Sequence, residues 1–195
     1  MARRSDHSRA ELEELILAAG EAHLAEAGFA AFSAREVAKR VGYSIGTIYN
    51  LFGSYDRLVL ALNARTLRAW AAFLEARLQA GGEDRIATLI HGYFDFAAEN
   101  RNRWMALYDH RMADKGPLPD DFNVAFAALV ALLQRQVAAV RGGGADAEIL
   151  ALTGSLVAIA HGHCMFELNG TYEMFGDWRP RDAALARIRE ALAAA

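Results

Sequence analysis

The sequence has little cysteine and little proline: Cys164 is its only cysteine, and it has three prolines in 195 residues. A single cysteine excludes an internal disulfide and a cysteine-rich zinc module. The scarcity of proline, together with abundant alanine and leucine, favours an all-helical chain. Residues 1–10 hold no apolar core behind their arginines, which is not typical of a secretory signal, so we expect a cytoplasmic protein.

The chain also lacks an excess of positive charge. Its formal net charge is -3, and residues 1–60 hold seven Lys or Arg against eight Asp or Glu. Domains that bind nucleic acid are commonly basic. A nucleic-acid interface in this chain must therefore depend on local geometry rather than on overall charge.

Apolar residues recur at helical spacing, and capping residues mark where helices begin. Ser8 with Glu11, and Ser33 with Glu36, each have the spacing of a capping box. No strand-like alternation and no internal repeat is present. The pattern predicts an all-α chain of about nine helices, near residues 8–27, 33–41, 45–51, 54–80, 84–100, 103–112, 120–141, 146–169 and 181–194.

Residues 33–52 have the spacing of a helix-turn-helix, with Gly42 at the turn between two short helices. The alternative is a plain helical hairpin within a bundle. In the second helix, Ile48 and Leu51 would face inward. The opposite side of its N-terminal half is slender and polar, which suits entry into the major groove of DNA. This polar side consists of Ser44, Gly46, Thr47 and Asn50.

Residues 32–62, FSAREVAKRVGYSIGTIYNLFGSYDRLVLAL, resemble the N-terminal domain of TetR-family transcriptional regulators. With the preceding helix, the resemblance covers about residues 8–62. It implies a helix-turn-helix DNA-binding domain at residues 1–54 and a larger helical ligand-binding and dimerisation domain at residues 55–195. The matching positions are Val37, Ala38, Gly42, Ser44, Gly46, Thr47, Ile48, Tyr49, Phe52, Ser54 and Leu58.

The resemblance also implies which side chains approach DNA. Ile45, Gly46 and Thr47 fall where the family approaches base edges, and a threonine offers a hydroxyl and a methyl group to the major groove. Tyr49 and Asn50 fall where the family holds backbone phosphates. The predicted DNA-binding residues are Arg35, Ser44, Ile45, Gly46, Thr47, Tyr49, Asn50 and Tyr55.

The cations around this segment are few. Tyr55 stands where the family often has a lysine, so a hydroxyl replaces one positive charge. Arg35, in the first turn of the preceding helix, is well placed for a phosphate. Arg3, Arg4 and Arg9 are expected to form a mobile basic arm that could add phosphate or minor-groove contacts.

Residues 149–166 contain no charged side chain over eighteen positions. A membrane span is one interpretation. The glycines and histidines within the segment, and the lack of basic flanks, favour a buried helix instead.

Gly154, Ala158 and Gly162 lie four apart on one face, so two helices could approach closely there; burial within the monomer is the alternative. The helices expected to pair two chains into a homodimer lie near residues 146–169 and 181–194.

The C-terminal half also has a weaker resemblance. Residues 159–170, IAHGHCMFELNG, resemble the signature of a TetR subgroup named for a Trp-His-Gly triplet, with Ala160 in the place of the tryptophan. TetR-like proteins use this half to sense a small molecule, and a pocket needs mostly apolar walls with a few polar groups. The alternative for each candidate is that it fills the core. The predicted ligand-binding residues are Trp70, Phe73, Phe94, Trp104, Met105, Tyr108, Phe126, His161 and Met165.

A cluster at His161, His163 and Cys164 raises the possibility of a metal site. His161 shares a helical face with Cys164, and His163 shares another with Glu167, but neither face supplies three good ligands. We therefore expect no metal and no cofactor. The sequence also contains no glycine-rich phosphate loop, nucleophile elbow or zinc-helix motif, so no enzymatic activity is expected.

The resemblance implies a homodimeric repressor that binds a pseudo-palindromic operator in double-stranded DNA. A small-molecule ligand would release it. Two alternatives remain at this point: a ligand-independent DNA-binding structural factor, and a metal-dependent helical enzyme.

Overall fold

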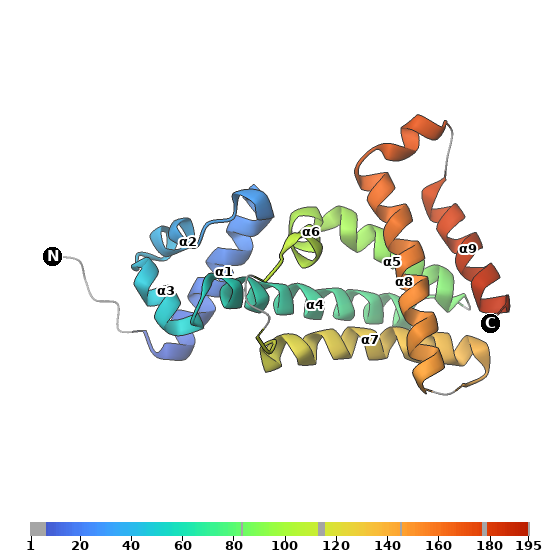
Figure 1. Ribbon diagram of the computed structural model, residues 1–195, viewed down its shortest axis with the longest axis horizontal. Coiled ribbons are helices and arrows are strands. Elements are labelled where there is room, and N and C mark those ends of the chain that lie inside the picture. The colour runs from blue at the N-terminus through green and yellow to red at the C-terminus, as the bar shows by residue number, and fades with distance from the viewer. Residues whose placement is uncertain (1–6, 83, 113–115, 145, 177–178, 195) are drawn as a thin grey trace. The chain divides into compact units, whose positions relative to one another are not determined.

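The computed structural model describes residues 7–82, 84–112, 116–144, 146–176 and 179–194. Over these residues the chain forms nine α-helices and two 3₁₀ helices, without a strand, so the predicted all-α class is confirmed (Figure 1). The α-helices are α1 (Arg9–Ala27), α2 (Ala34–Val41), α3 (Ile45–Phe52), α4 (Tyr55–Ala80), α5 (Arg85–Glu99), α6 (Arg101–Asp109), α7 (Asp120–Arg141), α8 (Asp146–Leu168) and α9 (Pro180–Ala194). The 3₁₀ helices are η1 (Phe29–Ala31) and η2 (Thr171–Phe175).

Side-chain caps fix the beginnings of the first two helices. The Ser8 hydroxyl accepts the Glu11 amide at 3.3 Å, and the Glu11 carboxylate accepts the Ser8 amide at 2.7 Å, so the first predicted capping box is confirmed. At α2, the Ser33 hydroxyl accepts the Glu36 amide at 3.4 Å. The Glu36 carboxylate lies 3.6 Å from Arg40 Nε. Glu36 therefore pairs along its own helix, and Ser33 supplies the cap.

Backbone contacts divide the chain into two compact units. The first unit contains the described parts of Met1–Leu67 and Asn100–Ala125, and the second contains those of Arg68–Glu99 and Phe126–Ala195. Helix α6 thus packs with α1 and η1 in the first unit. The functional division at residue 54 stays a prediction. It did not anticipate that α6 would pack with the N-terminal helices.

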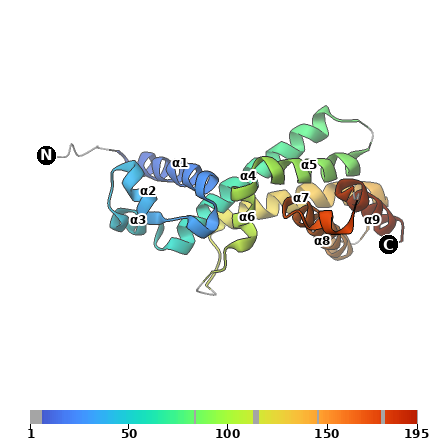
Figure 2. The same cartoon turned by 90° about the horizontal axis from the view of Figure 1, so that it is seen from above.

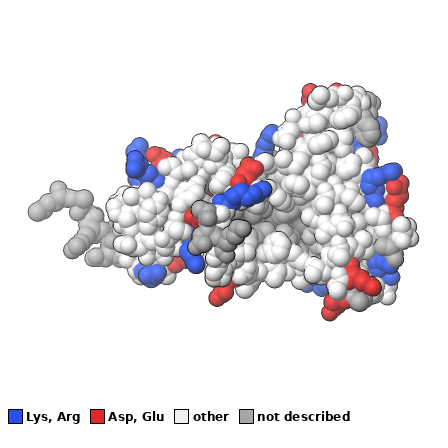
Figure 3. Space-filling model, viewed as in Figure 1, with Lys and Arg blue, Asp and Glu red and all other residues white. Residues whose placement is uncertain are grey.

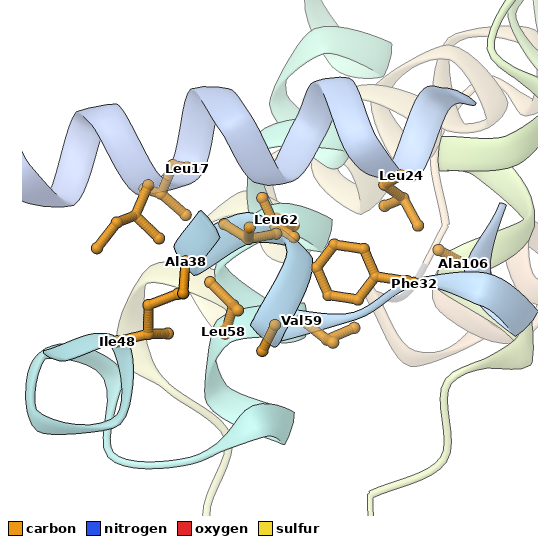
Figure 4. Packing of buried hydrophobic residues seen from close by; sticks show 12 residues of the cluster. Leu17, Leu24, Phe32, Ala38, Ile48, Leu58, Val59, Leu62 and Ala106 are labelled. Atoms are coloured by element: carbon orange, nitrogen blue, oxygen red, sulfur yellow. The ribbon is translucent and has the colours of Figure 1, made fainter. Parts of the chain in front are cut away.

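The first unit is built on one apolar core shared by α1, α2, α3, α4 and α6 (Figure 4). Val37 on α2 and Ile48 on α3 are fully buried in it, and Ile48 projects from α3 toward α2. Helices α1 and α4 approach closely, since a Cβ added at Gly20 would lie 3.0 Å from a methyl group of Leu62. Figure 2 shows the short helices α2 and α3 beside α1 from a second direction.

Polar contacts hold α6 onto this core. Arg103 forms an ion pair with Glu21 on α1 at 2.7 Å. The Asn63 side-chain amide, buried on α4, donates to the Ala106 carbonyl at 3.3 Å. Charge-assisted and buried hydrogen bonds of this kind are costly to break on one side only. Helix α6 is therefore a structural part of the unit that contains the helix-turn-helix.

The second unit packs α5, α8 and α9 together, and α8 and α9 run side by side (Figure 1). An ion cluster joins these helices to α4: Asp95 pairs with Arg77 at 2.6 Å and also with Arg181, which lies 3.4 Å from Glu167. Burial raises the pKa of Asp95, but the two guanidinium groups outweigh this effect and hold it below its usual value. By length and composition α7 and α8 could each cross a membrane, a property they share with core helices of soluble proteins.

Candidate functional site

Helices α2 and α3 form a helix-turn-helix, as predicted. Gly42 ends α2 in the left-handed conformation, with φ 75° and ψ 24°. The Ser44 hydroxyl then begins α3 by accepting the Thr47 amide at 3.1 Å. The sharp bend therefore results from one glycine and one N-cap, both encoded locally in the sequence.

The N-terminal half of α3 is open to solvent on the side away from the core. Ser44, Gly46 and Asn50 are exposed, and Tyr49 is 38% exposed. Ile45 and Thr47 are half-buried, and the Thr47 hydroxyl lies 3.0 Å from that of Ser44. The structure thus brings the predicted base-reading residues to one helix end, and their contacts with DNA stay a prediction.

Tyr55 begins α4 directly after α3. Its ring centroid lies 6.0 Å from that of Phe32, and the residue is half-buried against the core. Burial, followed by the charge of Asp56, raises the pKa of Tyr55. Its hydroxyl therefore remains protonated at neutral pH and can donate a hydrogen bond, but it adds no positive charge.

Positive charge lies around α3 and not on it, and the surface over α3 is white in Figure 3. Arg35 is exposed on α2. Arg9 lies in the first turn of α1, where it donates to the Leu51 carbonyl at 3.4 Å, so it belongs to a helix and not to a mobile arm. Arg3 and Arg4 lie outside the described residues. On this side, Arg35 is the cation predicted to hold a phosphate, together with polar groups of α3.

The predicted ligand-binding residues are divided between the two units. Trp104, Met105 and Tyr108 belong to the first unit, where Trp104 is fully buried. The others belong to the second unit, where Trp70 stacks on Phe96 with ring centroids 5.6 Å apart. The residues in the second unit are Trp70, Phe73, Phe94, Phe126, His161 and Met165.

A cavity of about 50 Å³ lies within the second unit. Among the predicted ligand residues, Trp70 lines it, and His161 Nδ1 lies 3.1 Å from the hydroxyl of Tyr93, which also lines it. Aliphatic residues at ordinary core spacing form most of the wall, so no local signal could have identified them. The lining residues are Trp70, Leu74, Ile86, Leu89, Ile90, Tyr93, Leu133, Val137, Thr153, Leu156, Val157, Ala160 and Ile188.

The two histidines that were considered for a metal site have different hydrogen-bond partners. His161 meets the Tyr93 hydroxyl, whereas His163 is hydrogen-bonded to the Tyr172 hydroxyl. Within the described residues, no three His, Cys, Asp or Glu side chains gather where they could hold a metal ion. Burial lowers the pKa of both histidines, with a smaller contribution from Arg187 at His163.

Cys164 is buried, and burial raises the pKa of its thiol to about 12. Because only the thiolate is a good nucleophile, we expect iodoacetamide to alkylate native Cys164 at pH 8 roughly a thousand-fold more slowly than a free cysteine. Mass spectrometry with and without denaturant measures this difference. Rapid modification of the folded protein would contradict the buried placement.

Comparison with known proteins agrees with this architecture. Residues 16–62 match the family profile "Bacterial regulatory proteins, tetR family", and residues 86–192 match "Tetracyclin repressor-like, C-terminal domain". No curated protein sequence matches the chain.

Several solved structures share the fold. A protein of unknown function from Rhodococcus sp. RHA1 is 20% identical, with a TM-score of 0.74 over 99% of this chain and 98% of its own. A TetR-family transcriptional regulator from Streptomyces coelicolor is 23% identical, with a TM-score of 0.64 over 95% and 98%. The multidrug binding protein EbrR, complexed with imidazole, is 17% identical, with a TM-score of 0.62 over 95% and 96%.

The two family profiles together span both the helix-turn-helix and the C-terminal helices. The chain therefore belongs to the TetR family of bacterial transcriptional regulators.

Proposed function

We propose that this regulator is a homodimeric repressor that leaves a pseudo-palindromic operator when a small molecule binds. The exposed polar end of α3, held on a buried apolar base, is the observation that supports DNA reading most directly. Two such helices, about 34–36 Å apart, would enter successive major grooves. A ligand would release the DNA by favouring a dimer geometry with another spacing.

The proposed DNA contacts come from the residues predicted above. Gly46 and Thr47 would approach base edges, while Tyr49, Asn50 and Arg35 would hold phosphates. A cytoplasmic location follows from this function, with α7 and α8 as helices of a soluble protein.

Fluorescence anisotropy with DNA upstream of the protein's own gene, at several salt concentrations, tests the proposal. We expect affinity to fall steeply with salt and to exceed that for random DNA. A flat salt response, or equal affinity for random DNA, would contradict it.

An uncovered apolar face on α8 supports the proposed homodimer. Leu150 and Phe166 are 51% and 43% exposed at the two ends of this face. Between them lie Gly154 and Gly162, where an added Cβ would meet nothing within 4 Å. Small residues let two helices approach closely, and apolar side chains gain stability when a partner covers them.

Ala158→Arg is expected to convert the dimer to a monomer. Ala158 is exposed between the two glycines, and an arginine there would bring two like charges together across the two-fold axis. Analytical ultracentrifugation measures the change. Ala98→Arg, at an exposed position of α5, is the matched control and should remain dimeric. Two variants that behave alike would exclude this face as the contact.

The C-terminal unit would supply the ligand site. One structural relative is a multidrug binding protein, and the second unit of this chain contains an apolar cavity. The residues of the second unit predicted for this role, including Phe73, Phe94, Phe126 and Met165, stay candidates alongside the cavity wall. Trp104, Met105 and Tyr108 belong to the first unit and do not line this cavity, and their ligand role stays a prediction.

A further inference from the structure

The cavity of the second unit has an uncharged wall. Thirteen residues from α4, α5, α7, α8 and α9 line it, and none of them is Lys, Arg, Asp, Glu or His. A ligand charge placed there would lose its hydration without gaining an opposite charge, which strongly disfavours binding. The wall therefore selects against carboxylates, phosphates and ammonium groups.

The hydroxyl groups in this wall already have partners. Thr153 donates to the Ile149 carbonyl, one turn earlier on α8, at 2.7 Å. The Tyr93 hydroxyl lies 3.1 Å from Nδ1 of His161, and burial lowers the pKa of this histidine, so its ring is neutral near pH 7. A ligand with several hydrogen-bonding groups would leave most of them unsatisfied. The polar groups of the wall suit at most one hydrogen-bonding group on the ligand.

The size of the cavity limits how a ligand can enter. At about 50 Å³ it is smaller than the cavity of about 150 Å³ that holds benzene in another protein. Leu74 already packs closely against α5, since its methyl group lies only 2.7 Å from where a Cβ at Gly92 would be. Leu133 on α7 and Val157 on α8 are only half-buried. Expansion of the cavity is therefore easiest on the side of α7 and α8.

We propose that this cavity is the regulator's ligand site and that its ligand is an uncharged, hydrocarbon-like molecule of about one ring, with at most one hydrogen-bonding group. The inference rests on the proposed function for its regulatory meaning, but the binding itself is independent of DNA. Because such a ligand is larger than the cavity, it can bind only when residues of the wall move apart. This coupling supplies the differential affinity that release from DNA requires.

Thermal unfolding of the full chain with three one-ring probes tests the ligand class. The probes are toluene, benzoate and benzylammonium, which share a ring and differ in charge. At about five times its Kd, toluene should raise Tm by about 2–4 °C. Benzoate and benzylammonium should leave Tm unchanged at equal concentration.

Three variants localise the effect. Ala160→Leu fills the cavity and should abolish the toluene shift, whereas Ala98→Leu adds the same atoms at an exposed position of α5 and should retain it. Leu133→Ala enlarges the cavity and should increase the shift, which keeps the test decisive if Ala160→Leu does not fold. The inference is overturned if toluene shifts neither the wild type nor Leu133→Ala, or if a charged probe shifts Tm as much as toluene.

Operator binding of the same wild-type sample separates the two proposals. Salt-dependent, sequence-specific DNA binding without any toluene shift would overturn the ligand class and leave the DNA-binding proposal standing. A toluene shift that Ala160→Leu removes, without specific DNA binding, would support the site and overturn the proposed function.

Discussion

Gly46→Glu is expected to make the protein more stable and unable to bind its operator. Gly46 is the second residue of α3, is exposed, and has no positive φ, and a Cβ there would meet only the Ser44 hydroxyl at 3.5 Å. Replacing a helical glycine removes backbone entropy from the unfolded chain, and a carboxylate in the first turn favours the helix dipole. Together these effects should add about 1 kcal/mol to the free energy of unfolding and raise Tm by about 2–4 °C.

The same carboxylate would enter the negatively charged groove of DNA. Like charges brought together in an interface cost several kcal/mol, so affinity for the operator should fall by about 100-fold or more. Gly46→Gln is the matched control, because it has the same shape and backbone effect without the charge. It should bind at least about ten-fold more tightly than the glutamate variant. Equal affinity of Gly46→Glu and wild type would place this helix end outside the DNA interface.

Ile48→Ala is expected to give the largest loss of stability among substitutions on α3. Ile48 is fully buried and anchors α3 to the core that it shares with α1 and α2 (Figure 4). Truncation loses buried apolar surface and leaves a cavity, at a cost of about 3 kcal/mol, which lowers Tm by about 6–12 °C. Chemical denaturation and calorimetry measure the change.

Two controls define the cause of that loss. Ile48→Val removes one methylene and should cost about 1 kcal/mol. Asn50→Ala, at an exposed position of the same helix, should change stability by less than about 0.5 kcal/mol. If Asn50→Ala destabilises the protein as much as Ile48→Ala, then α3 does not pack with Ile48 toward the core and Asn50 toward solvent.

Local signals in the sequence predicted the helix-turn-helix well. Ser8 and Ser44 cap helices through amides three residues away, and Gly42 ends α2 in a conformation that favours glycine. Each of these interactions spans only a few residues, so a single sequence contains all of the information. The same reasoning predicted a reciprocal contact at Glu36. A neighbouring cation on α2, Arg40, competes for that carboxylate.

Contacts between distant residues could not be predicted in this way. Helix α6 joins the first unit through pairs such as Arg103 with Glu21 and His110 with Asp56, the latter at 2.9 Å. A sequence shows that these residues are polar, but not which partner each will meet. Asp56 lies in the first turn of α4, directly after the helix-turn-helix, so His110 ties the end of α6 to the base of the candidate DNA interface.

The cavity of the second unit was the least predictable feature for a related reason. Aromatic residues such as Trp104 and Tyr108 attract attention in a sequence, yet their rings pack on each other in the first unit, with centroids 4.8 Å apart. The cavity is defined instead by gaps between aliphatic side chains of five helices, among them Leu133 and Val157. Such gaps depend on how whole helices pack, and no spacing along one chain encodes them.

A base-by-base substitution scan of the bound DNA, with wild type and Thr47→Ala, tests the claim that α3 reads the duplex. The structure predicts that wild type discriminates bases within two half-sites one helical turn, or a multiple of it, apart. Thr47→Ala should relax the preference at the same position of each half-site by about 1–3 kcal/mol and leave other positions unchanged. A uniform loss of affinity at every position, or an unchanged base preference, would show that α3 does not read the bases.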